Sequence, residues 1–311
     1  MPVHEPSYDR KASVAALVVN WNGGNIVLEA IRSLIASDGV ALHVLVIDND
    51  SHDGSCDEIG REFPQVEIRR NPSNVGASSA FAQGVTWARS QNEEFLFLLN
   101  PDAAIRPDCL FRLRQTLVAS DDAAACTPRI LDETKPGRVW YDGGYFTSGG
   151  IPLHRDMGAL QAEERGRENV DFFTGCAVLL RVAMVQEIGS FDERFFAYGE
   201  DTDLSLRLRS SGHTLLHDPS AQASHAPSAL LKSNAGKWLR DYYVVRNAFL
   251  LRKLHRSGGL LSLSSLTAVW YYVARPIVFF LLTAQFKRVA AVGRGVLDFG
   301  RGRFGEYPHD R

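Results

Sequence analysis

Short apolar runs alternate with amphipathic stretches through the first third of the chain. Four runs rich in branched and aromatic residues stand out, at 14–19, 43–47, 66–69 and 95–99. Runs of this length are typical of buried strands, and the amphipathic stretches between them have helical spacing. The alternation predicts an α/β domain.

A polar cluster follows each of these apolar runs. The four clusters are Asn20-Trp21-Asn22-Gly23-Gly24, Asp48-Asn49-Asp50-Ser51, Asn71-Pro72-Ser73-Asn74-Val75-Gly76 and Asn100-Pro101-Asp102. Open α/β sheets bind ligands at the carboxyl ends of their strands. The position of the clusters therefore predicts a ligand site at that edge of the sheet.

A crowded acidic segment is the second candidate site. In the sequence FFAYGEDTDLSLRL, three carboxylates, Glu200, Asp201 and Asp203, occupy four positions. The glycines on either side predict a helix that opens with acids, where the helix dipole favours negative charge. Mutual repulsion predicts a raised pKa for at least one carboxylate, or a cation nearby. The segment suits a general base, and it equally suits a solvated helix cap.

The second half of the chain is less regular. Residues 128–169 are Gly-rich and polar and predict a long loop with short strands, whereas the pattern from residue 236 onward is helical. The segment 258–286 carries a single charge, Arg275, followed at once by Pro276. Its uncharged part before that charge is slightly short for a transmembrane helix. We expect two half-buried or interfacial helices joined at Arg275–Pro276.

Charge is distributed unevenly along the 311 residues, although the net charge is only −2. Residues 1–231 carry 20 Lys/Arg and 32 Asp/Glu, a balance of −12, whereas residues 232–311 carry 14 and 4, a balance of +10. A basic tail predicts contact with an anionic partner, either a membrane surface or a phosphate-bearing acceptor. No nucleic-acid module is recognisable, so nucleic acid is not an expected partner.

Cysteine usage and the first residues bear on the compartment. The four cysteines are scattered without metal-ligand spacing, which favours a reducing compartment over a disulfide framework or a zinc site. The first eleven residues are polar and lack the apolar core of a signal peptide. The sequence therefore predicts a cytoplasmic protein.

Together and in order, these motifs resemble those of the inverting family 2 glycosyltransferases, and more narrowly the rhamnosyltransferase-like subgroup. The resemblance covers roughly residues 14–250. It rests on VVNWNGG, VIDNDSHDGS, NPSNVGASSAFAQG, LLNPDA, the segment from FFTGCAVLL to LRLRSSGH, and DYYVVRN. It implies the GT-A fold, an α/β Rossmann-like nucleotide-diphospho-sugar transferase architecture with a mixed sheet flanked by helices. The expected division is a disordered N-terminus at 1–12, a catalytic domain at 13–230 and a helical region at 231–311.

The resemblance implies a nucleotide site among the polar clusters. Asp48 matches the family's nucleoside-binding aspartate, with a turn-forming role after the strand as the alternative. Trp21 flanks the base or is a core aromatic, and Asn74 lines the site or caps a helix. Gly76 would let the backbone approach the ligand, and Arg246 would clamp the pyrophosphate or pair with surface acids. The full expected set is Val19, Trp21, Asp48, Asp50, Asn74, Gly76, Asn100 and Arg246.

The same resemblance implies a metal and a catalytic base. Asn100-Pro101-Asp102 stands where the family usually has Asp-x-Asp, so Asp102, with His225, is the expected ligand set for Mn²⁺ or Mg²⁺. The Asn in the first position leaves a strict metal requirement open. Asp201 matches the base that deprotonates the acceptor hydroxyl, and Glu200 would shape its pKa. Tyr198 and Asp203 are the expected acceptor-binding residues.

The function implied is inverting, metal-assisted transfer of a sugar, with rhamnose as the candidate, from a UDP- or dTDP-linked donor. The acceptor would be a glycan or a lipid-linked saccharide at the cytoplasmic membrane face, and the tail helices would form a homodimer. One alternative is a nucleotidyltransferase or sugar-nucleotide hydrolase on a similar core, but the first loop lacks the basic residues of such enzymes. The other is an inactive binding module, against which the retained Asp48, Asp102 and Asp201 argue.

Overall fold

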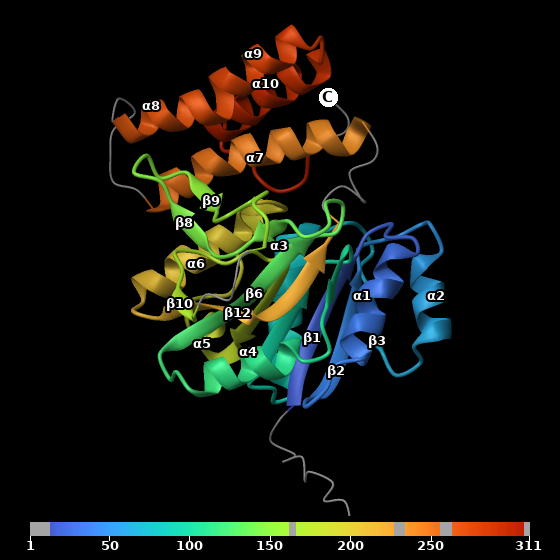
Figure 1. Ribbon diagram of the computed structural model, residues 1–311. Coiled ribbons are helices and arrows are strands. Elements are labelled where there is room, and N and C mark those ends of the chain that lie inside the picture. Colours follow the sequence, from blue (N-terminus) through green and yellow to red (C-terminus); the bar gives the residue numbers. More distant parts are fainter. Residues whose placement is uncertain (1–12, 162–165, 227–233, 256–262, 308–311) are drawn as a thin grey trace, which may run out of the picture.

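One large mixed sheet forms the centre of the molecule (Figure 1). The computed structural model describes residues 13–161, 166–226, 234–255 and 263–307, so the prediction for residues 1–12 lies outside the described residues. The sheet contains β1 (Ser13–Asn20), β2 (Ala41–Asp48), β3 (Glu67–Arg70), β4 (Phe95–Leu99), β5 (Ala103–Ile105), β6 (Ala123–Asp132), β7 (Val139–Tyr141), β10 (Glu168–Asn169), β11 (Ala177–Arg181) and β12 (Thr214–His225). A separate hairpin pairs β8 (Gly144–Phe146) with β9 (Pro152–His154).

The strand order places the carboxyl ends of the first strands side by side. The main path runs β10-β12-β6-β11-β4-β1-β2-β3, with β5 paired to β12 and β7 to β6. Strands β4, β1, β2 and β3 are mutually parallel, whereas β11 is antiparallel to both of its neighbours. Asn20 lies opposite Asp48, and Val18 lies opposite Leu99. The polar clusters predicted at the strand ends therefore share one edge.

Side-chain alternation along the strands explains why helices cover both faces of this sheet. In β1, Val14, Ala16 and Val18 belong to one core cluster, whereas Ala15 and Leu17 belong to the other. The first cluster is covered by α1 (Ile26–Ile35), α2 (Ser55–Glu62) and α4 (Cys109–Val118). The second is covered by α3 (Gly76–Ser90), α5 (Val182–Glu187) and α6 (Glu200–Ser210).

The C-terminal helices form a further layer at the carboxyl edge of the parallel strands (Figure 1). This layer consists of α7 (Asn234–His255), α8 (Leu263–Val269), a π-helical turn (Trp270–Ala274), α9 (Arg275–Leu282) and α10 (Phe286–Gly300). It has its own small core, in which Val245 of α7, Phe280 of α9 and Val292 of α10 pack together. The layer therefore lies over the edge at which the ligand site was predicted.

The structure corrects one feature of the predicted tail. We expected two helices joined at Arg275–Pro276, and α9 does begin at Arg275, but the helical path is continuous from Ser264 to Leu282. Pro276 lacks the N–H that would bond to the carbonyl of residue 272. The π-helical turn just before α9 widens the helix at this point and accommodates the missing bond. In residues 128–169 the expected short strands are present as β7 to β10.

Candidate active site

Asp48 is held at the carboxyl end of β2 by the strand beside it. The amide nitrogen Nδ2 of Asn20 donates to Asp48 Oδ1 at 2.8 Å and to Ser55 Oγ at 2.9 Å. The other carboxylate oxygen accepts from the backbone N–H of Ser51 at 3.2 Å, which is the turn-forming contact considered as an alternative. Asp48 is only 2% exposed. Its carboxylate is therefore fixed in place, and Asn20 is a site residue that the sequence reasoning missed.

The loop after β1 presents an exposed aromatic side chain directly after Asn20, the residue that holds Asp48. Trp21 is 51% exposed, so the core alternative for this residue is wrong. Val19, the penultimate residue of β1, is half-buried. Asp50 has a positive φ of 62° and lies near His52, with 3.4 Å between Oδ2 and Nε2. The exposed indole offers a stacking surface to a planar base, and the fixed Asp48 carboxylate offers a hydrogen-bond acceptor.

Asn74 forms a turn just before helix α3, in which Val75 and not Asn74 is the N-cap residue. The Oδ1 atom of Asn74 accepts from the backbone N–H of Gly76 at 2.9 Å, at the start of α3. Gly76 has a φ of +81°, and a Cβ at this position would lie 2.5 Å from the carbonyl oxygen of Phe196. Glycine is therefore needed here for the close approach to the Phe196 carbonyl, and a ligand contact of Gly76 stays a prediction. Asn49 ties this turn to β2 through its Nδ2 and the Gly76 carbonyl, at 3.2 Å.

Asp102 and His225 come together at the edge of the sheet, as the sequence predicted. Asp102 follows β4, and His225 ends β12, so pairing of β12 with β5 brings the two residues close. His225 Nε2 lies 3.2 Å from Asp102 Oδ1, and the residues are 6% and 9% exposed. Trp140 packs edge-on against the imidazole, with 4.3 Å between ring centroids. Asn100 stands two residues earlier, and its backbone N–H donates to the Cys176 carbonyl.

The charge state of this pair follows from its surroundings. Burial by itself would lower the pKa of His225, but the Cys176 sulfur and the Asp102 carboxylate raise that pKa to about 10. Among the described residues, no third His, Cys, Asp or Glu joins the pair in a cluster suited to a metal ion. Metal ligation requires a neutral imidazole, so a divalent cation at this pair would displace the proton of His225, and its remaining ligands would come from phosphate and water.

Glu200 and Asp201 open helix α6 with carboxylates in different surroundings. Asp201 Oδ2 accepts from the backbone N–H of Gly175 at 2.9 Å, and Oδ1 accepts from that of Thr202 at 2.7 Å. Burial raises the pKa of Asp201 against these hydrogen bonds. For Glu200, burial and the adjacent charge of Asp201 raise the pKa to about 8, and its buried Oε2 has no hydrogen-bond partner. The pKa of Glu200 is thus raised by both its burial and its charged neighbour, whereas Asp201 has backbone N–H donors from Gly175 and Thr202 that favour its charged form.

The loop that leads into these carboxylates is strained and clamped. Phe196 has φ 61° and ψ −61°, and the Ala197 N–H donates to the Phe195 carbonyl at 2.7 Å, which defines a γ-turn with positive φ. Tyr198 and Gly199 follow with φ of 67° and 98°. Three observations show how the protein holds this conformation.

Asn247 of α7 is the principal clamp. Its Nδ2 lies 2.8, 2.8 and 2.7 Å from the carbonyl oxygens of Phe195, Ala197 and Tyr198. The Phe196 ring stacks on Tyr243 of the same helix at 5.2 Å, and the Phe196 carbonyl accepts from the N–H of Ser78 in α3. Asn247 is therefore a site residue whose role could not be inferred from the sequence, although its motif was noticed.

Arg246 does not have the role that the sequence suggested. Its side chain is fully buried, and it donates to the carbonyls of Gly305 at 2.6 Å and Phe195 at 2.9 Å. Its guanidinium also lies over the rings of Tyr242 and Tyr243. With these partners the guanidinium has no access to a bound pyrophosphate, and it is not paired with surface acids either. Arg246 instead joins α7 to the loop before Glu200 and to the C-terminal segment.

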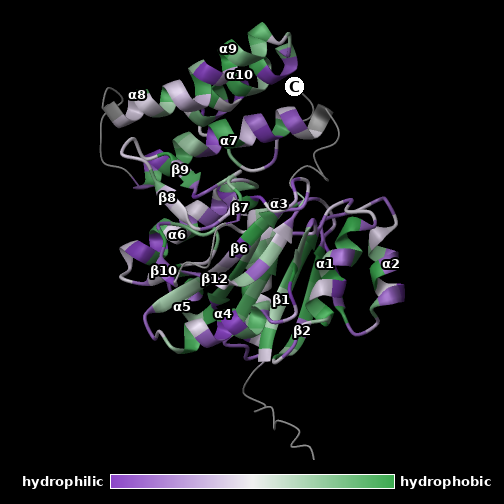
Figure 2. Ribbon diagram, in the orientation of Figure 1, coloured by the Kyte–Doolittle hydropathy of each residue, from purple (hydrophilic) through white to green (hydrophobic). Residues whose placement is uncertain are grey.

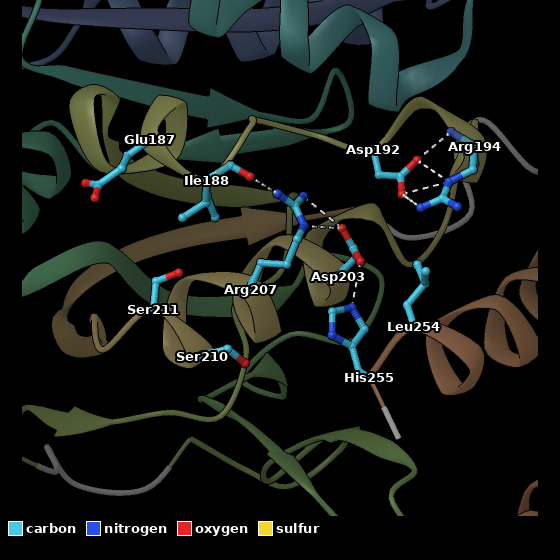
Figure 3. A pocket seen from close by; sticks show the side chains of 10 residues that line it. All are labelled: Glu187, Ile188, Asp192, Arg194, Asp203, Arg207, Ser210, Ser211, Leu254 and His255. Carbon is cyan, nitrogen blue, oxygen red and sulfur yellow. Dashed lines mark hydrogen bonds and ion pairs between the residues drawn. The ribbon is translucent and has the colours of Figure 1, made fainter. Parts of the chain in front are cut away.

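Asp203 is likewise engaged within the protein. It is fully buried, with Oδ2 accepting from Arg207 Nε at 2.8 Å and Oδ1 lying 2.7 Å from Nε2 of His255 in α7 (Figure 3). Because both carboxylate oxygens have partners, we correct the expectation that Asp203 binds the acceptor: it fixes α7 against α6. Tyr198, by contrast, stays partly exposed, and burial together with Glu200 and Asp102 raises the pKa of its phenol against the opposing effect of Arg240.

Comparison with known proteins agrees with this geometry. Residues 16–189 match the family model "Glycosyl transferase family 2". The chain is 27% identical over 232 residues to the N-acetylglucosaminyl-diphospho-decaprenol L-rhamnosyltransferase of Mycobacterium tuberculosis, covering 67% of this chain and 74% of that relative. It is also 25% identical over 202 residues to a low-salt glycan biosynthesis hexosyltransferase of Haloferax volcanii, covering 63% of this chain and 61% of that protein.

Solved structures establish the fold. A mannosyltransferase of Pyrobaculum calidifontis, in complex with GDP-Man and Mn²⁺, superposes with a TM-score of 0.58 at 14% identity, over 93% of this chain and 87% of that chain. GalNAc-T7 with UDP, GalNAc and Mn²⁺ gives a TM-score of 0.56 at 14% identity, over 84% of this chain and about half, 54%, of that chain. The fold is GT-A, as the motifs implied.

Proposed function

Because the chain belongs to glycosyltransferase family 2, within its rhamnosyltransferase-like subgroup, we propose that it transfers a sugar, with rhamnose as the candidate, from a UDP- or dTDP-linked donor. The observation that supports this most directly is the gathering of Asp48, the Asp102–His225 pair and Asp201 at one edge of the sheet. This edge carries a hydrogen-bond acceptor for the nucleoside, a candidate cation site for the diphosphate, and a carboxylate that would deprotonate the acceptor hydroxyl.

The nucleoside part of the donor would occupy the ends of β1 and β2. Asp48 accepts hydrogen bonds, which suits the N3–H of uracil or thymine or a ribose hydroxyl. The exposed indole of Trp21 would stack on the base, with Val19 and Asp50 lining the same pocket. Fixing the carboxylate through Asn20 spares the ordering cost when the nucleotide binds.

Asp102 and His225 would hold a divalent cation, Mn²⁺ or Mg²⁺, next to Asn100. The cation would act as a Lewis acid and stabilise the charge on the departing diphosphate. Two protein ligands are few, so we expect the diphosphate itself to complete the coordination. Metal affinity should therefore be low without nucleotide and should rise when nucleotide is present.

Asp201 would act as the general base. Its raised pKa makes it a stronger acceptor for the proton of the acceptor hydroxyl, and the raised pKa of the neighbouring Glu200 favours the uncharged form of that side chain. As the hydroxyl oxygen bonds to the anomeric carbon, the bond from that carbon to the diphosphate oxygen breaks, and the proton moves to Asp201. One displacement of this kind inverts the anomeric centre. Tyr198 stands beside these carboxylates and would contact the acceptor.

The relatives named above act in glycan assembly, and we propose a corresponding acceptor, a glycan or a lipid-linked saccharide at the cytoplasmic side of a membrane. Residues 13–230 would form the catalytic unit, and residues 231–311 its acceptor-side extension. The contacts of Asn247 with the loop before Glu200 support a direct role of this extension in shaping the active site.

A matched pair of substitutions tests the assignment of the base. Asp201→Asn should lower kcat by about 10²–10⁴-fold with the donor Kd unchanged, because the acceptor proton loses its destination. Glu200→Gln mimics the protonated side chain and should keep kcat within about tenfold of the unaltered protein. Equal losses in both variants, or a larger loss in Glu200→Gln, would remove Asp201 from the role of base. Full donor binding without turnover in the unaltered protein, across sugar acceptors, would favour the binding-module alternative.

A further inference from the structure

The helix formed by α8, the π-helical turn and α9 is apolar on the side that faces away from the protein. Among the described residues it is the one helix long and apolar enough to cross a membrane, at 19 residues and a mean hydropathy of 1.5. Large side chains on its outer side and at the start of α10 are exposed: Leu266, Val269, Trp270, Val278, Phe279, Leu281, Leu282 and Phe286. Figure 2 shows hydrophobic colouring concentrated in α9, whereas α8 is paler. Contiguous exposed apolar surface marks an interaction site.

The inner side of the same helix is attached to the rest of the protein. Ala268 is fully buried, and Phe280 is 5% exposed in a cluster with Val245 and Val292. A Cβ on Gly149, in the turn between β8 and β9, would lie 2.6 Å from Thr267, so that turn and α8 are in close contact. A helix that crossed a bilayer would have to leave these contacts, whereas a helix that lies flat on a surface keeps them.

The charges around the apolar side are of one sign. Residues 264–287, which make up this side, contain no Asp or Glu and two cationic residues, Arg275 and Lys287. Arg275 lies within the apolar stripe, above the ring of Tyr271, and Lys287 follows Phe286; both are exposed. Two copies of such a surface would repel each other, and an anionic surface would attract it. Aromatic and aliphatic side chains rimmed by cations are characteristic of helices that lie in the headgroup region of a membrane.

We propose that this surface, the outer side of residues 264–286, docks flat on the headgroup region of a bilayer that contains anionic phospholipid. In Figure 1, β1 and β2 run toward the helical layer, so the docking surface and the carboxyl edge of these strands lie toward the same end of the molecule. Docking would hold the carboxyl edge of these strands near the membrane without insertion of a spanning helix. The proposal rests on the shape and charge of this layer and not on the glycosyl-transfer chemistry.

Vesicle flotation with the full chain tests the proposal. Vesicles of phosphatidylcholine alone are compared with vesicles in which one third is phosphatidylglycerol, for the unaltered protein and two charge-matched variants. Phe279→Glu/Leu282→Glu alters the proposed surface, and Phe111→Glu/Val118→Glu alters exposed positions of α4 instead. We expect the unaltered protein and the α4 variant to float with anionic vesicles, and added salt to weaken flotation. The surface variant should partition about 100-fold less, at about tenfold for each apolar side chain withdrawn.

Each outcome decides for or against the proposal. Circular dichroism and thermal unfolding establish that the variants are folded, so a loss confined to the surface variant supports it. Flotation that is equal with neutral vesicles, or unaffected in the surface variant, overturns it. Retention of bound protein in vesicles washed with alkaline carbonate would show a spanning helix and also overturn it. The proposal is also overturned if the unaltered protein fails to float and is a dimer, while the surface variant is a monomer. The surface would then join two copies of the chain.

Discussion

Asn247→Ala probes the link between the C-terminal helices and catalysis. The substitution removes the Nδ2 group that faces three carbonyl oxygens of the Phe195–Tyr198 loop, while the helix around it can persist because alanine has the highest helix propensity. It also removes the Oδ1 acceptor of Arg246 Nε, at 2.9 Å. The loop would then lose its main restraint next to Glu200 and Asp201.

The size of the effect can be worked out from these contacts. Asn247 is 1% exposed, so water cannot readily replace the lost donor. A buried polar group left without its partner costs about 1–3 kcal/mol, and we expect a loss of about 2–3 kcal/mol in the free energy of unfolding. The positive-φ turn at Phe196 is unfavourable by a further amount on the order of 1–3 kcal/mol, which favours its relaxation once it is released. Displacing Asp201 from its working position should lower kcat by about 10–100-fold.

The assay separates catalysis from stability. Thermal unfolding gives the stability loss, and kcat and the donor KM are measured at a temperature where the variant is fully folded. We expect kcat to fall and KM for the donor to change little, because Asp48 and Trp21 lie on other elements. Tyr243→Phe is the matched control: it removes the hydroxyl that accepts from the Tyr307 N–H but keeps the ring against Phe196. Its kcat should stay near that of the unaltered protein. A stability loss in Asn247→Ala with unchanged kcat would refute the reasoning.

Three further results are expected. Gly76→Ala should destabilise the fold by about 2 kcal/mol or more and lower kcat, seen in unfolding curves and rates, because φ is +81° and the added Cβ would meet the Phe196 carbonyl. The acid limb of the kcat profile should lie above the ordinary carboxyl pKa of about 3.9, since burial raises the pKa of Asp201 and protonation removes the base; a limb below that value would count against this role. Burial alone would raise the pKa of Asp142, but hydrogen bonds from His217 and Arg129 lower it to about 2, so its stabilisation is present above pH of about 3.9 and is lost as the pH falls toward 2. Asp142→Asn should cost about 3–5 kcal/mol in neutral denaturant titrations, and the difference should shrink over that acid range.

The positions of the first strands, and the edge of the sheet at which a ligand would bind, could be predicted because they depend on the local pattern of apolar and polar residues. The run predicted at 95–99 coincides with β4, and the run at 14–19 lies within β1, because short apolar runs bounded by polar turns have few alternatives. The pairing of Asp102 with His225 was also anticipated, through the order of motifs typical of the family.

The roles that could not be predicted depend on which segments meet across the fold. Arg246 and Asn247 were noticed as a motif, but only the structure shows that α7 returns to the loop at residues 195–198. The reason for glycine at position 76 lies 120 residues away, in the Phe196 carbonyl. Asp203 is a partial exception, because its spacing from Arg207, four residues on, already allowed an ion pair along the helix.

Calorimetric titration with UDP and with dTDP, each in the presence and absence of Mn²⁺, tests the central claim most directly. The account predicts that one of the two nucleotides binds tightly, that binding strengthens with Mn²⁺, and that Asp102→Ala abolishes the Mn²⁺-dependent part. Asp48→Asn should weaken binding with and without the metal. If neither nucleotide binds, or if binding is the same in Asp102→Ala with Mn²⁺ present, the assignment of this edge as a metal-assisted nucleotide-sugar site is contradicted.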